Sequence, residues 1–402
     1  MPKASRRKGA SENDQDNSSS LFMEQERVLN TYDNGTDFPS SFKVFKLSEF
    51  AKNLKIDIVS ESEDGMVLEF DLIHVEAPIA NALRRVLIAE VPTMALEKIY
   101  LYQNTSVIQD EVLCHRLGLL PVKADPRFFE WPDKRVVEVN AEGVDVDEEP
   151  AGEQEKNLIF SIDVTCKVNK SADPAATNPK DRFDNSHVYT NAFKWVPIGE
   201  QKETFSMDKP RMVNDDILVA KLRPGQQIEA RCHCVKGVGR DHAKFSPVAT
   251  ATYRLLPTIK LKEKITGEAA ERLQASFSQG VVDIVEQKGE KLKEKITGEA
   301  AERLQASFSQ GVVDIVEQKG EKVAKVVDAR RDTCSRNVLR HEDLAQKVEL
   351  SRKKDHFIFS VESTGALKSS ELVVEACKVM EAKALGLKQL IEEQLNIIEK
   401  ME

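Results

Sequence analysis

Four residues near the middle of the chain are of the types that bind zinc: Cys232, His233, Cys234 and His242. Thiolate sulfur and imidazole nitrogen are the usual ligands of that metal. The surrounding segment, IEARCHCV, alternates with period two, so both cysteines share one face of an expected strand with Ile228 and Ala230. His233 points to the other face. A half-buried strand therefore explains these residues better than a metal site.

A second candidate chemistry is nucleotide binding by Gly237-Val238-Gly239. This segment lacks the third glycine and the strand-to-helix setting that direct backbone N–H groups at a pyrophosphate. Its expected role is a turn between strands. An independent metal- or nucleotide-binding enzyme built around Cys232, Cys234 and His242 remains the alternative from a different functional class.

A third candidate chemistry is the recognition of carboxylates by Arg84 and Arg85, because each guanidinium can form two hydrogen bonds at once. Their helix is expected from Pro78 to about Glu90, where Val91-Pro92 ends it. Its apolar residues recur at three and four positions and form one stripe: Ile79, Ala82, Leu83, Val86 and Leu87. The stripe is either core or partner interface, and the other interpretation of the arginines is a solvated polar face.

The segment after this helix predicts a strand and a short second helix. The strand covers Ala95 to Tyr102 and ends at Asn104-Thr105-Ser106. Asp110 is expected to cap the helix EVLCHRLG, and Gly118 is expected to close it.

In order and spacing, the residues between positions 81 and 121 resemble the signature of the alpha-like subunits of archaeal and eukaryotic RNA polymerases. The matching residues are Asn81, Leu83, Arg84, Arg85, Ala95, Asn104, Ser106, Asp110, Glu111, Leu113, Arg116, Leu117, Gly118 and Pro121. Three further segments look like the larger alpha-like subunit shared by RNA polymerases I and III: residues 215–218 with KLRPGQ, residues 237–257 and residues 355–367. The second segment contains His242 and Lys244, which we expect to be structural or partner-facing.

The resemblance implies a non-catalytic assembly subunit of DNA-directed RNA polymerases I and III. Such a subunit pairs with a smaller alpha-like subunit, and the pair supports the two largest, catalytic subunits during synthesis of rRNA precursors and small RNAs. Arg84 and Arg85 would face the large subunits, while Ile79, Leu83 and Val86 would belong to the dimer interface. DNA and RNA would be contacted only through the complex, in the nucleus and nucleolus. A polymerase II-type alpha-like subunit is the closer alternative.

A long amphipathic helix is expected near the C-terminus, from Ser369 or Ser370 to about Glu399. Its apolar seam follows steps of four and three: Val373, Cys377, Met380, Ala384, Leu387, Ile391, Ile398 and Met401. A helix packed within its own chain is the alternative. Because the family dimerises through this helix, the resemblance favours packing against the smaller alpha-like subunit.

Composition limits the other possibilities. The chain has 402 residues, of which 41% are hydrophobic, and a formal net charge of -9. An acidic chain is not expected to hold nucleic acid directly, since such proteins usually present a basic surface to phosphates. The six cysteines are mostly far apart, which indicates a reducing compartment. No stretch is long and apolar enough to predict a membrane span.

The expected fold class is α+β, with a discontinuous dimerisation domain of strands and long helices. A disordered arm at 1–41 precedes its first part at 42–93, in which Lys55 to Val59 and Val67 to Val75 could form a hairpin. An inserted, mostly β domain follows at 94–248, then a ferredoxin-like α/β region at 249–350, and the second part of the dimerisation domain at 351–402.

The ferredoxin-like region contains a duplication, because residues 260–290 are repeated without change as residues 291–321. We expect one copy to fill the native position and the other to form an added excursion. The only cysteine between Cys234 and Cys377 is Cys334, whereas an iron–sulfur cluster needs about four thiolates. No cysteine lies between Cys114 and Cys166, where the polymerase II counterpart has a cysteine-rich zinc loop. We therefore predict no cofactor.

Overall fold

The computed structural model describes residues 20–24, 28–29, 46–132, 152–173, 177–262, 265, 267–277, 281–286, 322–332 and 336–401. Within these ranges, only the backbone is described for residues 283–286, 322–325, 343 and 397–401. The chain divides into two compact units. The first comprises Met1–Asp57, Asp71–Ala80 and Tyr253–Ile358, and the second comprises Ile58–Phe70, Asn81–Thr252 and Phe359–Glu402.

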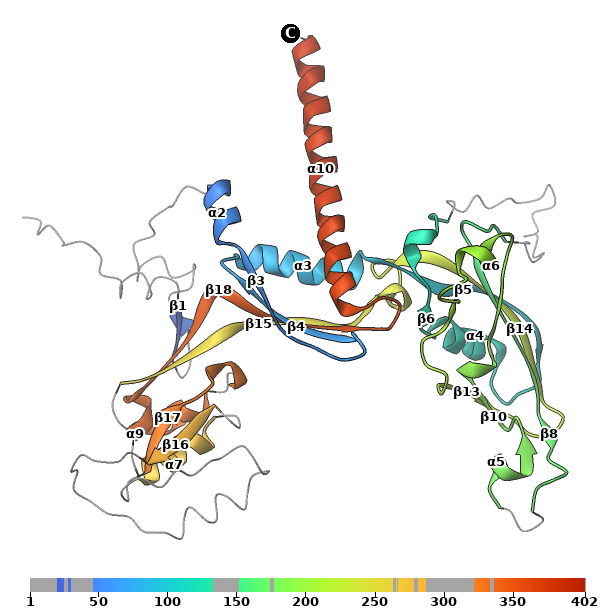
Figure 1. Cartoon of the computed structure of the whole chain (residues 1–402), viewed down its shortest axis with the longest axis horizontal. Coiled ribbons are helices and arrows are strands. Elements are labelled where there is room, and N and C mark those ends of the chain that lie inside the picture. Colours follow the sequence, from blue (N-terminus) through green and yellow to red (C-terminus); the bar gives the residue numbers. More distant parts are fainter. Residues whose placement is uncertain are drawn as a thin grey trace, which may run out of the picture. The chain divides into compact units, whose positions relative to one another are not determined.

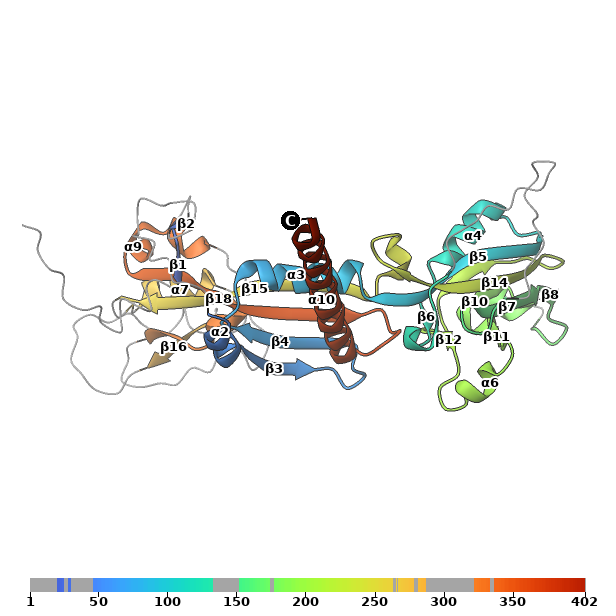
Figure 2. The same ribbon diagram turned by 90° about the horizontal axis from the view of Figure 1, so that it is seen from above.

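The largest sheet has six strands and contains the predicted hairpin of β3 (Lys55–Glu61) and β4 (Val67–Ile73). Its order is β2-β1-β18-β4-β3, with β15 also paired with β18 (Figures 1 and 2). The remaining members are β1 (Ser20–Met23), β2 (Val28–Leu29), β15 (Val248–Leu261) and β18 (Val348–Ser363). The apolar alternation of β4 explains its central place, since Leu68, Phe70 and Leu72 are buried.

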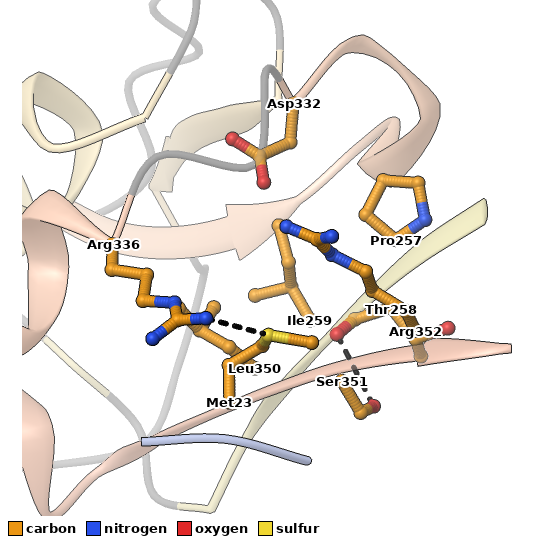
Figure 3. A pocket seen from close by; sticks show the side chains of 9 residues that line it. All are labelled: Met23, Pro257, Thr258, Ile259, Asp332, Arg336, Leu350, Ser351 and Arg352. Atoms are coloured by element: carbon orange, nitrogen blue, oxygen red, sulfur yellow. Dashed lines mark hydrogen bonds between the residues drawn. The ribbon is translucent and has the colours of Figure 1, made fainter. Parts of the chain in front are cut away.

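Part of the arm expected to be disordered is ordered in the first unit. Strand β1 pairs antiparallel with β18, from Ser20 opposite Lys353 to Met23 opposite Leu350. Arg336 anchors this strand, because its Nη1 donates to the Glu24 carbonyl at 3.0 Å and its Nη2 lies 3.6 Å from the Met23 sulfur (Figure 3). The composition of residues 1–41 is polar on average and predicts disorder, but the short apolar segment SLFM within it is able to form a strand.

The cavity beside this anchor is too small for a ligand. Its volume is about 10 Å³, which is enough for a single water molecule. Met23, residues of β15 and β18, Asp332 and Arg336 line it (Figure 3). It is a packing gap at the junction of the strands.

Between α3 (Ala77–Ala89) and β15 the second unit is mostly β, and we call this part the β domain; a separate inserted domain at 94–248 stays a prediction. Four antiparallel strands pair in the order β11-β7-β14-β5, namely Lys194–Val196, Leu158–Thr165, Gln227–Val238 and Pro92–Asn104. The short helix α4 (Asp110–Gly118) contributes fully buried Leu113 and Leu117 to the same apolar cluster as this sheet. Smaller pairs complete the domain: β6 (Val122–Lys123) with β12 (Arg211–Met212), β8 (Lys167–Val168) with β9 (Phe183–Asp184), and β10 (His187–Tyr189) with β13 (Leu218–Lys221).

The region that carries the duplication forms a small cluster in the first unit. Helix α7 (Glu268–Ala275) and strand β16 (Val282–Glu286) come from the first copy, and β16 pairs antiparallel with β17 (Lys322–Val326). Ala270 and Leu273 of α7 are fully buried in an apolar core. The second copy and Cys334 lie outside the described residues. The ferredoxin-like arrangement stays a prediction.

Candidate assembly surface

The signature helix is present as α3 (Ala77–Ala89), one residue from the predicted start and end. Leu83 and Val86 are only 7% and 6% exposed, whereas Ile79 is 39% exposed. The prediction that all three belong to a dimer interface is therefore corrected for Leu83 and Val86, which are part of this chain's own core. The apolar period identified the packed face correctly, but the period is the same whichever chain covers it.

The two arginines on α3 have different environments. Arg84 donates from Nε and Nη2 to the Asn81 side-chain oxygen at 3.1 and 2.9 Å, so Asn81 fixes its guanidinium. Arg85 is exposed. A fixed fork beside a free one can present several N–H donors to carboxylates of a partner.

The end of α3 is held by the segment that follows β14. The Arg240 N–H donates to the Ala89 carbonyl at 2.8 Å, and a Cβ at Gly239 would clash with the Ile88 carbonyl oxygen. A Cβ at Gly237 would lie 2.6 Å from the Phe245 ring. These glycines therefore permit close backbone packing. The expected turn needs correction, because Gly237 lies inside strand β14.

Other signature residues shape the connection between β5 and α4. The Asn104 amide donates to the Asp110 carboxylate at 2.7 Å and to the Ile108 carbonyl at 2.9 Å, while its oxygen accepts from Ser106. Gln109 precedes the helix, so Asp110 is the first helical residue and not the cap predicted for it. Exposed Glu111 follows it in the first turn.

The remaining signature residues join neighbouring elements. Arg116 donates to the Leu218 and Val219 carbonyls of β13, and the Pro121 carbonyl accepts from Val213. Gly118 ends α4 without a positive φ, so it does not close the helix in the way expected of a glycine.

Lys244 and His242 also have structural positions. The Lys244 ammonium donates to the Leu96 carbonyl and pairs with Glu97, both at 2.7 Å. The His242 Nδ1 accepts from the Lys244 N–H at 3.1 Å at the start of a single 3₁₀ turn, Ala243–Phe245. These contacts give Lys244 and His242 a role in holding neighbouring segments of this chain together.

Three of the four candidate zinc ligands are buried in the β domain, whereas His242 is exposed. Cys232 and Cys234 are fully buried, and burial raises the pKa of Cys232 to about 12 and that of Cys234 well above its ordinary value. His233 is 2% exposed and its ring meets Tyr100 edge-on, so this strand is covered on both faces and is not half-buried as predicted. Within the described ranges, no three His, Cys, Asp or Glu side chains are grouped to hold a metal.

The C-terminal helix α10 (Ser369–Met401) is held by its own chain over its first turns. Ser369, Leu372 and Ala376 are fully buried, and the Ser369 hydroxyl donates to the Met66 carbonyl. Arg127 pairs with Glu371 at 3.1 Å and with Glu375 at 3.6 Å. Nothing in the sequence around Arg127 marks it as a contact residue, because its partners lie far along the chain.

The later turns of α10 present an uncovered apolar face. From 381 to 396 every residue is exposed except half-buried Gly386, and Figure 1 shows α10 continuing as one long helix. Leu387 and Ile391 are 60% and 51% exposed, whereas Val373 and Met380 are half-buried. The Ile398 side chain lies outside the described residues. Leu390 and Leu395 widen this face and were missed, since they lie beside the strict seam.

Of the helices in the described parts of the chain, none combines the length and the apolar character that a membrane crossing requires.

Comparison with known proteins shows which family this chain belongs to. Residues 69–384 match the family model described as the RNA polymerase Rpb3/Rpb11 dimerisation domain. The chain is 44% identical over 352 residues to the mouse protein named DNA-directed RNA polymerases I and III subunit RPAC1, covering 87% of this chain and 88% of that protein. The protein of the same name from Saccharomyces cerevisiae is 41% identical over 371 residues, covering 91% and 96%.

A more distant relative is the DNA-directed RNA polymerase II subunit rpb3 of Dictyostelium discoideum. It is 28% identical over 344 residues, which cover 84% of this chain and 94% of that protein. Taken with the predicted α3 signature and the long C-terminal helix, these matches show that the chain belongs to the RNA polymerase Rpb3/Rpb11 dimerisation domain family.

Proposed function

We propose that this protein is a non-catalytic assembly subunit of DNA-directed RNA polymerases I and III. It pairs with a smaller alpha-like subunit, and the pair provides the platform for the two largest, catalytic subunits. Transcription of rRNA precursors and small RNAs in the nucleus, including the nucleolus, is the process it supports.

The observation that carries this proposal is the free apolar face of α10. Four large apolar side chains, Leu387, Leu390, Ile391 and Leu395, are between 51% and 60% exposed. Removing such area from water stabilises a complex by about 25 cal/mol per Å², so a second helix laid along this face would be favoured. A helix of the smaller alpha-like subunit is the proposed occupant, as in a family named for its dimerisation domain.

The choice of polymerase rests on the relatives. Identity is 41–44% to proteins named as subunits of polymerases I and III, and 28% to one named as a polymerase II subunit. The polymerase II alternative is therefore weaker. The enzyme alternative loses its motivation, because Cys232, Cys234 and His242 occupy structural positions.

Contact with the large subunits is assigned to the exposed side of α3. Arg85 is free to bind a partner carboxylate, and Arg84 is already oriented by Asn81. The packed face of the same helix is fixed to its own chain through Leu83 and Val86, so the arginines are presented on a rigid element.

The test is affinity purification of the tagged full-length chain from cells, followed by mass spectrometry of the proteins that accompany it. Recovery of a smaller alpha-like subunit with the largest subunits of polymerases I and III is the expected result. Recovery of polymerase II subunits instead would favour the alternative, and a monomer with no polymerase component would reject the proposal.

A further inference from the structure

A basic surface lies at one end of the β domain, where two small strand pairs meet. We call it the basic tip and define it by Lys180, Arg182, His187, Lys221 and Arg223. Helix α5 (Pro179–Arg182) leads into β9, and β10 pairs with β13 so that His187 lies opposite Lys221. Figure 1 shows α5, β10 and β13 close together in the second unit.

The backbone connections around the tip keep its cations close to one another. The Leu222 N–H donates to the Ser186 carbonyl at 2.8 Å, and the Asn169 N–H donates to the Arg182 carbonyl at 3.0 Å. The pKa of His187 is lowered by burial and then by the charges of Lys180, Lys221 and Arg223. Three cations therefore act on one imidazole ring.

The charge of the tip is not neutralised by its own acids. The described residues include no ion pair within salt-bridge distance for Lys180, Lys221 or Arg223, and all three side chains are exposed. Asp181 and Asp184 are the acidic residues of the same segment, and both are exposed. A positive surface of this kind, on a chain with a formal net charge of -9, is suited to an anionic partner.

Aromatic rings alternate with these cations. The Lys180 nitrogen lies 5.5 Å from the Tyr189 ring centroid, and the Arg182 guanidinium carbon lies 5.5 Å from the Phe183 ring. The rings of His187 and Tyr189 are stacked, with 17° between their planes. Surfaces that bind single-stranded nucleic acid combine cations, which bind the phosphates, with aromatic rings, on which the bases stack. An acidic peptide would be bound by the cations alone, which would leave the aromatic rings without a role.

From this placement we propose that the basic tip binds single-stranded nucleic acid, with Lys180, Lys221 and Arg223 on phosphates and Tyr189 supporting a base. The net charge of the chain argued for indirect contact only, but net charge averages over all surfaces. Lys180 is exposed, so in this proposal its side chain moves from the Tyr189 ring to a phosphate and leaves the ring face open to a base. This site does not depend on the assembly function proposed above.

The experiment measures binding of a fluorescent oligo(U) RNA of about 20 nucleotides to the full-length protein with its co-purifying partners. The test variant is Lys180→Glu with Lys221→Glu and Arg223→Glu. A matched control, Lys202→Glu with Lys209→Glu and Arg211→Glu, makes the same charge change at exposed positions elsewhere in the domain. Thermal unfolding confirms that both variants fold.

The test variant should raise Kd on the order of tenfold or more, and the slope of log Kd against log salt should fall by about 2, or about 0.7 for each phosphate that the protein no longer neutralises. Tyr189→Leu keeps an apolar side chain and should weaken binding of RNA but not of inorganic polyphosphate, which has no bases. Equal loss in the control variant, no RNA binding by the parent protein, or tip-dependent binding of poly-glutamate instead of RNA would each overturn the assignment. Equal effects of Tyr189→Leu on RNA and polyphosphate would do so as well.

Discussion

Lys383 on α10 forms an ion pair with Glu90 at the end of α3, with 2.7 Å between the ammonium nitrogen and a carboxylate oxygen. Both side chains are partly exposed, so the pair itself contributes about 1 kcal/mol at most. Its importance is positional. Beyond Lys383, residues 384–396 are all exposed except half-buried Gly386, and the apolar face of α10 continues without cover from its own chain.

Leu387→Asp with Ile391→Asp should abolish the heterodimer without unfolding the protein. Both side chains are at least half exposed, so the free chain loses little, whereas a paired helix would have to bury two carboxylates. Co-purification of the smaller alpha-like subunit measures the effect. The control is Leu385→Asp. The Leu385 side chain is 53% exposed, similar to the other two, but it lies about 200° around the helix from Leu387. If the double variant still captured its partner at normal yield, α10 would not be the interface.

Arg84→Glu with Arg85→Glu should leave the heterodimer intact and reduce recovery of the two large subunits by about tenfold or more, equivalent to about 1.4 kcal/mol. Arg85→Glu alone should cause most of the loss, because Arg84 is tied to Asn81. Quantitative mass spectrometry of purified complexes reports both numbers. Equal loss of the small and large partners would show that α3 serves dimerisation.

The buried thiols of Cys232 and Cys234 should make the protein less stable in alkaline solution. Above about pH 9 the unfolded thiols lose their protons while the folded ones keep them, since burial raises the pKa of Cys232 from 9.0 to about 12 and that of Cys234 well above 9.0. The unfolded state is therefore favoured as pH rises, by about 1.4 kcal/mol per pH unit for each thiol. Denaturant unfolding at several pH values should show this slope, and Cys232→Ala with Cys234→Ala should reduce it, while the raised pKa values of Cys114 and Cys166 keep a smaller slope in place. Burial also raises the pKa of Cys377, but this residue is exposed, so a Cys377→Ala control should lower the slope less than the double variant does.

Asp71 should be important for stability at neutral pH. Arg330 donates to both of its carboxylate oxygens, one at 2.7 Å, and His356 Nε2 lies at 3.0 Å. Burial acts to raise the pKa of Asp71, but the bonds from Arg330 and His356 outweigh it and lower that pKa. Asp71→Asn should cost about 3–5 kcal/mol because it leaves a largely buried guanidinium without its counter-charge.

The cost of Asp71→Asn should shrink in acid. A depressed folded pKa contributes stability above the ordinary value of 3.8, and this stability is lost as pH falls through the folded pKa. Urea unfolding at neutral and acidic pH measures the difference. Asp57→Asn is the control, because its exposed pair with Lys55 should be worth less than about 1 kcal/mol. An equal cost for both variants would contradict the ranking.

Deleting residues 291–321 should preserve or raise the melting temperature. Strand β16 ends with Glu286 opposite Lys322, so removal of the second copy leaves QKGE, residues 287–290, to join the two strands. A four-residue connection is ordinary for a hairpin. Shortening the loop should lower its closure cost by about 2 kcal/mol. A clear fall in melting temperature would show that the second copy stabilises the fold.

The residues of α3 and α10 show how much of the fold was predictable. The three-and-four spacing of apolar residues gave α3 to within one residue, and alternation with β-branched and aromatic residues gave β3, β4 and β5. These patterns are local, because one face of each element must be apolar to be buried at all. The motif from Asn81 to Pro121 also identified the family from the order of residues alone.

Local patterns could not say which chain covers a given face. Leu83 and Leu387 occupy equivalent apolar positions in two amphipathic helices, yet one is 7% exposed and the other 60%. That difference is decided by elements far apart in the chain, such as Glu90 meeting Lys383 and Arg127 meeting Glu371. The amino-acid order alone determined which faces avoid water and which family the chain joins. Only the tertiary structure decided which of those faces remain open, because burial depends on neighbours that sequence spacing does not specify.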